Sequence, residues 1–204
     1  MSDEIETALG AAAVAPLGGA PRRLSRELAL RADAEGLVDV AYAMTDSPLG
    51  PVMLAATDRG LVMLSYALDG IDSRLERLAR EVSPRVMEVP SRLDAQRREL
   101  DEYFTGRRRD FGLAIDWRLM SGFARSVLER TAAIPFGGSS TYGAIAAEAG
   151  SPRGSRATGN ALGSNPIPIV IPCHRVVRSG GAIGGYTGGV ERKRFLLDLE
   201  GHRR

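Results

Sequence analysis

The sequence predicts a two-domain α/β protein, with a small N-terminal α/β domain around an antiparallel sheet and a mainly helical C-terminal domain. Three short apolar segments separated by turn sequences lie between residues 38 and 66. Helical periodicity and connections rich in Gly and Pro dominate residues 118–204. The 204 residues, 44% hydrophobic and 25% charged, have an ordinary globular composition and suit one domain or two small ones.

Residues 1–36 are rich in Ala, Gly and Arg and predict an extension with a mobile start, a loop at Pro16–Pro21 and a short helix over 22–34. Turns at 47–50 and 58–60 divide the strand region into a meander. The expected strands are Val38–Ala43, Val52–Thr57 and Leu61–Tyr66, with Phe111–Ile115 as a candidate for a further strand. The expected helices are Ser73–Glu81 and Leu93–Phe104. We place the domain boundary near Asp116–Met120, so that the N-terminal domain spans 37–117 and the C-terminal domain 118–204.

The C-terminal half is expected to hold four helices. The first covers Phe123–Ala133, and the last, an apolar helix, covers Arg192–Glu200. Between them, Ser139, Ser140 and Thr141 are N-cap candidates for a helix over Tyr142–Ala149, which Gly150 closes. Ser151-Pro152 is typical of the start of a new helix running toward Leu162. Two short helices around a Gly-containing turn, the second bearing Arg153 and Arg156, form a candidate helix-turn-helix.

Charge is distributed unevenly along the chain. Residues 1–117 carry a net charge of −5 and residues 118–204 carry +7, within an overall +2. A basic half indicates an anionic partner such as nucleic acid, although a solvated Arg-rich surface has the same pattern. No apolar run approaches the roughly 20 residues that span a bilayer. The acidic start Met-Ser-Asp-Glu-Ile-Glu is unlike a signal peptide, so we expect a cytoplasmic protein without membrane attachment.

Cys173, in the run Ile-Pro-Cys-His-Arg-Val-Val, is the only cysteine in the chain. It has no internal disulfide partner, and one Cys with two His cannot complete a four-ligand zinc site. It is therefore either an inert buried thiol or a nucleophile. His174 follows directly, and Arg175 supplies positive charge that favours a thiolate. The proline-rich residues 165–172 predict a rigid, extended lead-in to the cysteine.

Adjacent side chains do not face one another on a helix or strand, so His174 is expected to reach the Cys173 sulfur through a water, as a general base. Glu200 is the candidate carboxylate for orienting the imidazole, although a Glu near the end of a chain is usually just solvated. Residues 180–189 contain six glycines but match no phosphate-binding loop, so no nucleotide cofactor is indicated. They either form a flexible hairpin or approach a flat ligand closely, with Tyr186 and Thr187 as a wall.

Three segments together resemble the O6-alkylguanine-DNA alkyltransferase family. They are Asn165-Pro-x-Pro-x-x-x-Pro-Cys-His-Arg-Val-Val177, Gly184-x-Tyr186-x-Gly-Gly189 and Leu196-Leu-x-x-Glu-Gly201. The resemblance runs from about Phe123 to Gly201, whereas the N-terminal half matches only in outline and would be ribonuclease-H-like. Ser155, Thr158 and Leu128 depart from the family pattern.

The resemblance implies a role for each matching residue. Cys173 would be the alkyl acceptor, with His174 and Glu200 completing a Cys–water–His–Glu network. Asn165 would stabilise the active-site turn, and Tyr142 would protonate or hydrogen-bond the departing guanine. The implied DNA-binding residues are the finger Arg156, which replaces the flipped base, and Arg153, Tyr142, Ala157, Gly159 and Arg175. The implied substrate pocket consists of Tyr186, Thr187, Leu162 and Val176.

By the same resemblance the protein would reverse O6-alkylguanine, and less efficiently O4-alkylthymine, in one irreversible turnover without metal or cofactor. Its partner would be double-stranded DNA containing alkylated bases, bound in the minor groove with base flipping, by a protein that is monomeric in solution. Two alternatives stay open at this point. A non-catalytic sensor of alkylated DNA would share the fold but lack the acceptor cysteine, and a cysteine hydrolase would turn over repeatedly.

Overall fold

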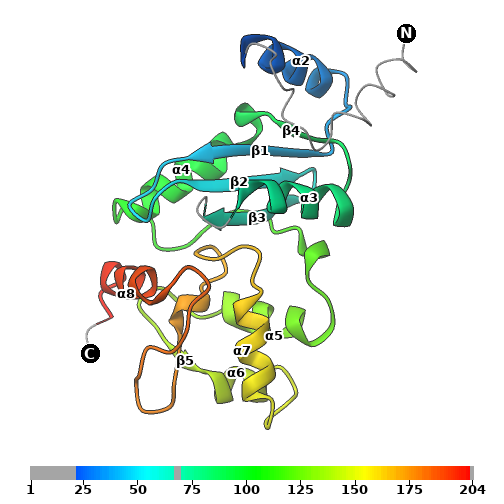
Figure 1. Ribbon diagram of the computed structural model, residues 1–204. Coiled ribbons are helices and arrows are strands. Elements are labelled where there is room, and N and C mark those ends of the chain that lie inside the picture. The colour runs from blue at the N-terminus through cyan, green and yellow to red at the C-terminus, as the bar shows by residue number, and fades with distance from the viewer. Residues whose placement is uncertain (1–21, 67–69, 203–204) are drawn as a thin grey trace. The chain divides into compact units, whose positions relative to one another are not determined.

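The structure is a computed structural model that describes residues 22–66 and 70–202 (Figure 1). The chain divides into two compact units. One comprises Met1–Arg98 and Leu113–Leu119, and the other comprises Glu99–Gly112 and Met120–Arg204. The expected mobile start and the loop at Pro16–Pro21 lie outside the described residues. Among the described residues, no helix is long and apolar enough to cross a membrane.

The first unit is built on a four-stranded sheet with strand order β3-β2-β1-β4. The strands are β1 (Val40–Thr45), β2 (Val52–Thr57), β3 (Gly60–Tyr66) and β4 (Val86–Glu88). The first three form the predicted antiparallel meander, and β4 pairs in parallel with β1, so the sheet is mixed. The sequence did not indicate β4 because three residues are too few to show alternation. The candidate strand at Phe111–Ile115 is wrong: Ile115 forms only a single bridge, with Leu61.

Helices complete the first unit. They are α2 (Arg22–Ala34), α3 (Ile71–Glu81) and the short 3₁₀ helices η2 (Pro90–Leu93) and η3 (Trp117–Leu119). The helix α4 (Asp94–Phe104) contributes residues to both units. β2 is buried along its whole length, as expected for a strand covered on both faces. On one face Leu78 of α3 packs with Val40, Met53 and Met63, and this apolar cluster is the core of the unit. The α/β prediction for this half is therefore confirmed.

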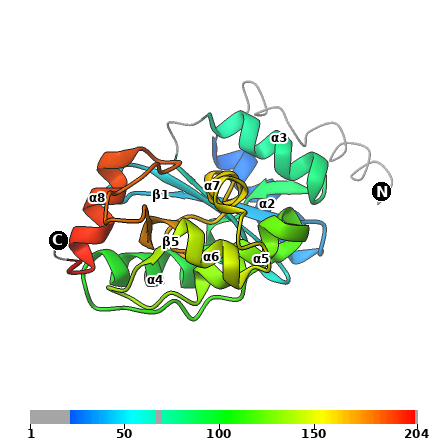
Figure 2. The same ribbon diagram turned by 90° about the horizontal axis from the view of Figure 1, so that it is seen from below.

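The second unit is mainly helical, as predicted. It contains α5 (Gly122–Ala132), α6 (Tyr142–Glu148), α7 (Ser155–Gly163) and α8 (Val190–Leu199), with η4 (Cys173–Arg175) and the short parallel strands β5 (Ser140–Thr141) and β6 (Val176–Val177). Figure 2 shows α5, α6 and α7 packed side by side.

The start of each helix in the α6–α7 pair has a local cause. Thr141 caps α6, because its hydroxyl accepts a hydrogen bond from the Ala144 N–H at 3.2 Å. Gly150, with a φ of 84°, follows its end. The predicted helix start at Ser151 is wrong: the Ser151 carbonyl accepts from the Gly154 N–H at 2.7 Å, so these residues form a tight turn and α7 begins at Ser155. The two helices retain the predicted order of helix, turn and helix.

Gly60 provides a test of the first unit. Its φ is 131°, and a Cβ at this position would lie 2.3 Å from the Ala114 carbonyl oxygen. We expect Gly60→Ala to lower the free energy of unfolding by more than the roughly 1–3 kcal/mol that backbone strain alone costs, because the substitution adds a steric clash to that strain. The matched control is Gly36→Ala, where φ is also positive but nothing lies within 4 Å of the added carbon. Chemical denaturation of both variants measures the difference, and equal losses would contradict the role of the Ala114 contact.

Candidate active site

The segment before Cys173 folds back on itself. The Ile171 N–H donates to the Ile167 carbonyl at 2.9 Å, and Pro168 forms a bridge with Ile171. Ile169 has a φ of 76°, and it is the one non-glycine residue with positive φ among residues 22–66 and 70–202. The prediction of an extended lead-in is therefore wrong. The prolines prevent ordinary strand pairing, as predicted, but these residues form a tight turn and not an extended segment.

Asn165 holds this turn together. Its Nδ2 donates to the Ile171 carbonyl at 2.9 Å and to the Cys173 sulfur at 3.2 Å, while its Oδ1 accepts from the Ile167 N–H at 3.0 Å. Asn165 is itself buried. One amide thus fixes both the backbone turn and the position of the sulfur. The donor on the sulfur also favours a thiolate over a thiol.

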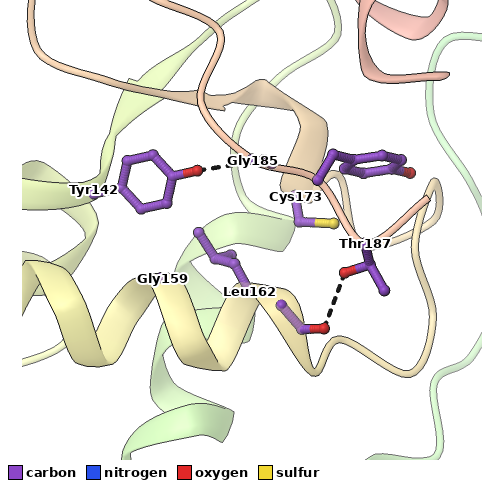
Figure 3. Close-up of a pocket in the computed structure, with 8 residues that line it drawn as sticks. Tyr142, Gly159, Leu162, Cys173, Gly185 and Thr187 are labelled. Carbon is purple, nitrogen blue, oxygen red and sulfur yellow. Dashed lines mark hydrogen bonds between the residues drawn. The ribbon is translucent and has the colours of Figure 1, made fainter. Parts of the chain in front are cut away.

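A pocket of about 390 Å³ opens beside Cys173 (Figure 3). That volume is within the range of small-molecule sites and accommodates a ligand of nucleobase size. The lining residues are Tyr142, Gly159, Leu162, Gly163, Cys173, Gly185, Tyr186 and Thr187. Figure 3 shows that these side chains come from α6, α7, the Cys173 turn and the glycine-rich loop.

The glycine-rich loop is tied to the rest of the pocket at two points. The Tyr142 hydroxyl donates to the Gly185 carbonyl at 3.5 Å, and the Thr187 hydroxyl donates to the Gly163 carbonyl at 2.9 Å. Gly184 has a φ of 72°, which favours glycine, and a Cβ there would lie 2.9 Å from the Tyr142 hydroxyl oxygen. These contacts favour the prediction of a ligand wall over that of a flexible hairpin.

Glu200 forms a buried cluster with residues that follow Cys173. Its Oε1 lies 2.8 Å from His174 Nε2, and neither side chain is exposed. Arg175 donates from Nε to Oε2 and from Nη2 to Oε1, both at 2.9 Å, which is the bidentate geometry that favours an ionised carboxylate. Tyr103 donates to Oε1 at 2.7 Å, and the Gly137 N–H donates to Oε2 at 3.3 Å. Glu200 is therefore a structural centre of the unit, not a solvated terminal side chain.

The protonation state of His174 follows from these contacts. Burial alone would raise the pKa of Glu200, but the hydrogen bonds from His174, Arg175 and Tyr103 lower it from 4.5 to about 2. An ionised carboxylate only accepts hydrogen bonds, so Nε2 of His174 carries the proton that is donated to Glu200. Nδ1 is then the basic nitrogen. It is buried and has no hydrogen-bond partner among the described residues.

The resting site holds a thiol and a neutral imidazole at neutral pH. Burial raises the pKa of the Cys173 thiol to about 11, although the Asn165 amide and the positive charge of Lys193 act in the opposite direction. Burial also lowers the pKa of His174, against the effect of Glu200. Any reaction of the sulfur must therefore begin by moving its proton, which is the role that the sequence analysis expected of His174 as a general base.

The structure brings most of the predicted site residues together. Cys173, Tyr142, Leu162, Tyr186 and Thr187 all line the pocket, and so does Gly159, which was predicted as a DNA contact. The side chains of Arg153, Arg156 and Ala157 are exposed at the start of α7 and in the turn before it.

Two residues do not lie where they were predicted, one as a DNA contact and one as part of the pocket lining. Arg175 is 5% exposed and bound to Glu200 and the Ile134 carbonyl, so its guanidinium is not at the surface where a DNA contact was expected. The same contacts occupy the charge that was expected to favour a Cys173 thiolate. Val176 is fully buried and is not among the residues that line the pocket.

The sequence analysis did not identify Tyr103 and Lys193. Tyr103 gave no signal, because an aromatic residue near the end of a helix is most often part of a core. Lys193 did give one, since it lies three residues before Leu196 and four before Leu197, on the apolar face of the last helix. A lysine on such a face is buried at a cost in free energy and therefore indicates a specific contact.

The fold and the site define a protein with one cysteine nucleophile in a nucleobase-sized pocket, next to a helix-turn-helix. Residues 122–202 match the family model for the DNA-binding domain of 6-O-methylguanine DNA methyltransferase, and residues 40–117 match the model for its ribonuclease-like domain. The chain belongs to the 6-O-methylguanine DNA methyltransferase family.

Similar proteins cover almost the same span. The methylated-DNA--protein-cysteine methyltransferase of Methanosarcina acetivorans is 36% identical in an alignment of 167 residues that covers 78% of this chain and 97% of that protein. The Mycobacterium bovis protein of the same name is 35% identical over 164 residues, covering 80% and 94% of the two chains. The crystal structure of Mycobacterium tuberculosis OGT in complex with DNA has a TM-score of 0.66 at 34% identity and covers 78% of this chain and 92% of that one.

The lowered pKa of Glu200 predicts how stability depends on pH. A carboxyl group with a folded-state pKa of about 2, below its usual 4.5, stabilises the fold above about pH 4.5 and loses that contribution as the pH falls toward 2. We expect Glu200→Gln to lower the free energy of unfolding at neutral pH by about 3–5 kcal/mol, because Arg175 loses its buried partner. The difference from the native sequence should shrink between pH 4.5 and 2.

Chemical denaturation at a series of pH values measures this difference. The control is Glu129→Gln, which removes an exposed carboxylate paired with Arg125 and should change the free energy by less than about 1 kcal/mol. A loss in Glu200→Gln that stays constant down to pH 2 would show that ionisation of Glu200 does not stabilise the fold.

Proposed function

We propose that this protein repairs DNA by direct reversal, transferring the alkyl group of O6-alkylguanine to Cys173 in a single irreversible turnover. One observation carries the proposal: the only cysteine, oriented by Asn165, opens on a nucleobase-sized pocket and is followed by a histidine whose free ring nitrogen is basic. O4-alkylthymine is a second, less efficient substrate in this proposal. A non-catalytic sensor is disfavoured because the acceptor cysteine is present.

The reaction begins with removal of the thiol proton. The proton passes from Cys173 through a bridging water to Nδ1 of His174, and the Glu200 carboxylate stabilises the imidazolium that forms. The thiolate then attacks the alkyl carbon. A carbon–sulfur bond forms while the bond from that carbon to O6 breaks, and the electron pair of the broken bond remains on the guanine.

Tyr142 completes the exchange at the base. Its hydroxyl lies on the pocket wall, where burial raises its pKa, so it keeps its proton at neutral pH and can donate it. The guanine receives its proton from Tyr142. His174 then loses to solvent the proton that it took from the thiol, and Tyr142 regains one from solvent, so overall the thiol hydrogen and the alkyl group exchange places. The thioether product is stable, so the alkyl group stays on Cys173 and each protein molecule reacts once.

The proposed partner is double-stranded DNA containing an alkylated base, bound through the minor groove by a monomer. Arg156 on α7 is exposed and is proposed to fill the gap that the flipped base leaves in the duplex. Arg153 and Ala157 are exposed in the same region and are proposed as neighbouring contacts. We propose that the protein acts in the cytoplasm, where a reduced thiol is maintained.

Intact mass spectrometry tests the reaction. After incubation with excess O6-methylguanine duplex, we expect the mass to rise by one methyl group per chain and then stop changing. Cys173→Ser should gain nothing. A cysteine hydrolase would leave the chain unmodified while releasing product repeatedly, and that result would contradict the proposal.

Substitution of Arg156 distinguishes an effect on base flipping from an effect on the alkyl transfer itself. Because it is exposed on α7 and does not line the pocket, Arg156→Ala should slow repair of duplex DNA by about tenfold or more while leaving the reaction with free O6-benzylguanine within about twofold. Arg194→Ala is the charge-matched control, since Arg194 is exposed on α8 and paired with Glu191. Rates on both substrates are measured by single-turnover kinetics, and equal losses in Arg156→Ala would argue against the finger.

A further inference from the structure

Tyr103 brings a hydroxyl group to the Glu200 cluster from the N-terminal half of the sequence. It lies on α4, within the residues that match the ribonuclease-like domain, whereas His174 and Glu200 lie within the match to the DNA-binding domain. Its hydroxyl donates to Glu200 Oε1 at 2.7 Å across 97 residues of sequence. The phenol is the donor of this pair, because an ionised carboxylate only accepts hydrogen bonds. The proton transfers proposed for the reaction do not involve this hydroxyl.

The ring of Tyr103 is held in a cluster of aromatic side chains. It is fully buried, and its centroid lies 5.4 Å from that of Phe104, 5.2 Å from that of Phe111 and 6.2 Å from that of Phe136. A phenylalanine would fill the same space, and a buried hydroxyl costs free energy unless it is hydrogen-bonded. The hydroxyl is therefore explained by its hydrogen bond to Glu200 and not by the packing of the ring.

Oε1 of Glu200 accepts hydrogen bonds from more donors than it has lone pairs. His174 Nε2 lies 2.8 Å away, Arg175 Nη2 2.9 Å and the Tyr103 hydroxyl 2.7 Å, so three donors share an oxygen with about two lone-pair sites. Each donor stabilises part of the negative charge and leaves less of it for the others. The bond from Tyr103, which is the shortest of the three, therefore limits how strongly Glu200 holds a protonated His174.

The charges around His174 make this limit important. Burial lowers the pKa of His174, and the charges of Arg175 and Lys193 lower it further, whereas Glu200 raises it. Burial raises the pKa of Glu200, and Tyr103 is among the donors that lower it, after His174 and Arg175. The effect of Tyr103 on His174 is thus indirect and passes through a single carboxylate oxygen.

We propose that Tyr103 is a positioning residue that moderates the general base: its hydroxyl shares Oε1 of Glu200 with His174 Nε2 and so limits the stabilisation that the carboxylate gives to the protonated imidazole. The proposal rests on His174 being the base for Cys173 in the proposed alkyl transfer. It predicts that loss of the hydroxyl strengthens the base. A tyrosine that merely held Glu200 in place would have the opposite effect, because its loss would loosen the carboxylate and weaken the base.

Titration of the imidazole tests the proposal. The chain has two histidines, so NMR follows both rings, and His202→Gln assigns the signals. We expect Tyr103→Phe to raise the pKa of His174 and to move the acidic limb of the pH–rate profile with O6-benzylguanine to higher pH. Above that limb the rate should rise by roughly twofold to fivefold, because a stronger base removes the thiol proton more readily.

The matched control is Tyr66→Phe, which removes the hydroxyl of a buried tyrosine from β3 in the other unit and should leave the His174 titration unchanged. An unshifted His174 titration in folded Tyr103→Phe would overturn the proposal. So would a lowered pKa of His174 with a slower reaction, which is the result expected of a purely supporting hydroxyl.

Tyrosine fluorinated next to the hydroxyl provides a second measurement, which keeps the side chain. Fluorine makes the phenol a stronger donor, so its incorporation at the five tyrosines should lower the pKa of His174. The same incorporation into Tyr103→Phe should have no effect, which separates Tyr103 from the other tyrosines. An identical His174 titration with and without fluorine, or a shift that persists in Tyr103→Phe, would contradict the shared oxygen.

These measurements separate the inference from the proposed function. The imidazole titrations report the coupling of Tyr103 to His174 whether or not any alkyl group is transferred. The methylated-DNA mass experiment reports transfer whether or not the two residues are coupled. A transferring protein with an uncoupled tyrosine refutes the inference alone, and a coupled pair without transfer refutes the proposed function alone.

Discussion

The second unit depends on the buried Glu200 carboxylate. Its two oxygens accept hydrogen bonds from His174, Arg175, Tyr103 and the Gly137 backbone, which join the end of α8 to α4 and to the segment after α5. A buried carboxylate is stable only when such donors surround it, so the loss of one donor weakens the others. Because Glu200 remains ionised, it also decides which nitrogen of His174 is basic. The same carboxylate therefore stabilises the fold and determines the tautomer of His174.

The ion pair between Glu200 and Arg175 limits the basicity of the site. Arg175 reduces the negative charge that His174 experiences, and its own charge further disfavours a protonated imidazole. Burial of Cys173 acts in the same direction on the sulfur, because it raises the pKa of the thiol to about 11 and keeps the resting cysteine protonated. For a protein that is consumed by one reaction, a quiescent thiol is an advantage, because a free thiolate would react with any electrophile that entered the pocket.

The sequence predicted the helices and the strand meander well because their apolar patterns are long enough to repeat. It also predicted a site of Cys173, His174, Glu200 and a pocket wall, from the residues themselves and from a family resemblance carried by contiguous motifs. It could not predict the tight turn at Ile169, because the positive φ there depends on the buried Asn165 amide, which only the folded chain supplies. The sequence also could not predict that Arg175 pairs with Glu200, because a charged residue next to a nucleophile in sequence need not point toward it.

Lys193 shows how a pattern and a structure can be combined. In sequence it is one polar residue on an apolar helix face, and in the fold it is a buried ammonium group that donates to the Val176 and Gly185 carbonyls. Two of the cations near the nucleophile thus have separate tasks. Arg175 forms a fixed, bidentate pair that a guanidinium suits, and Lys193 acts as a compact charge whose carbonyl partners leave it uncompensated.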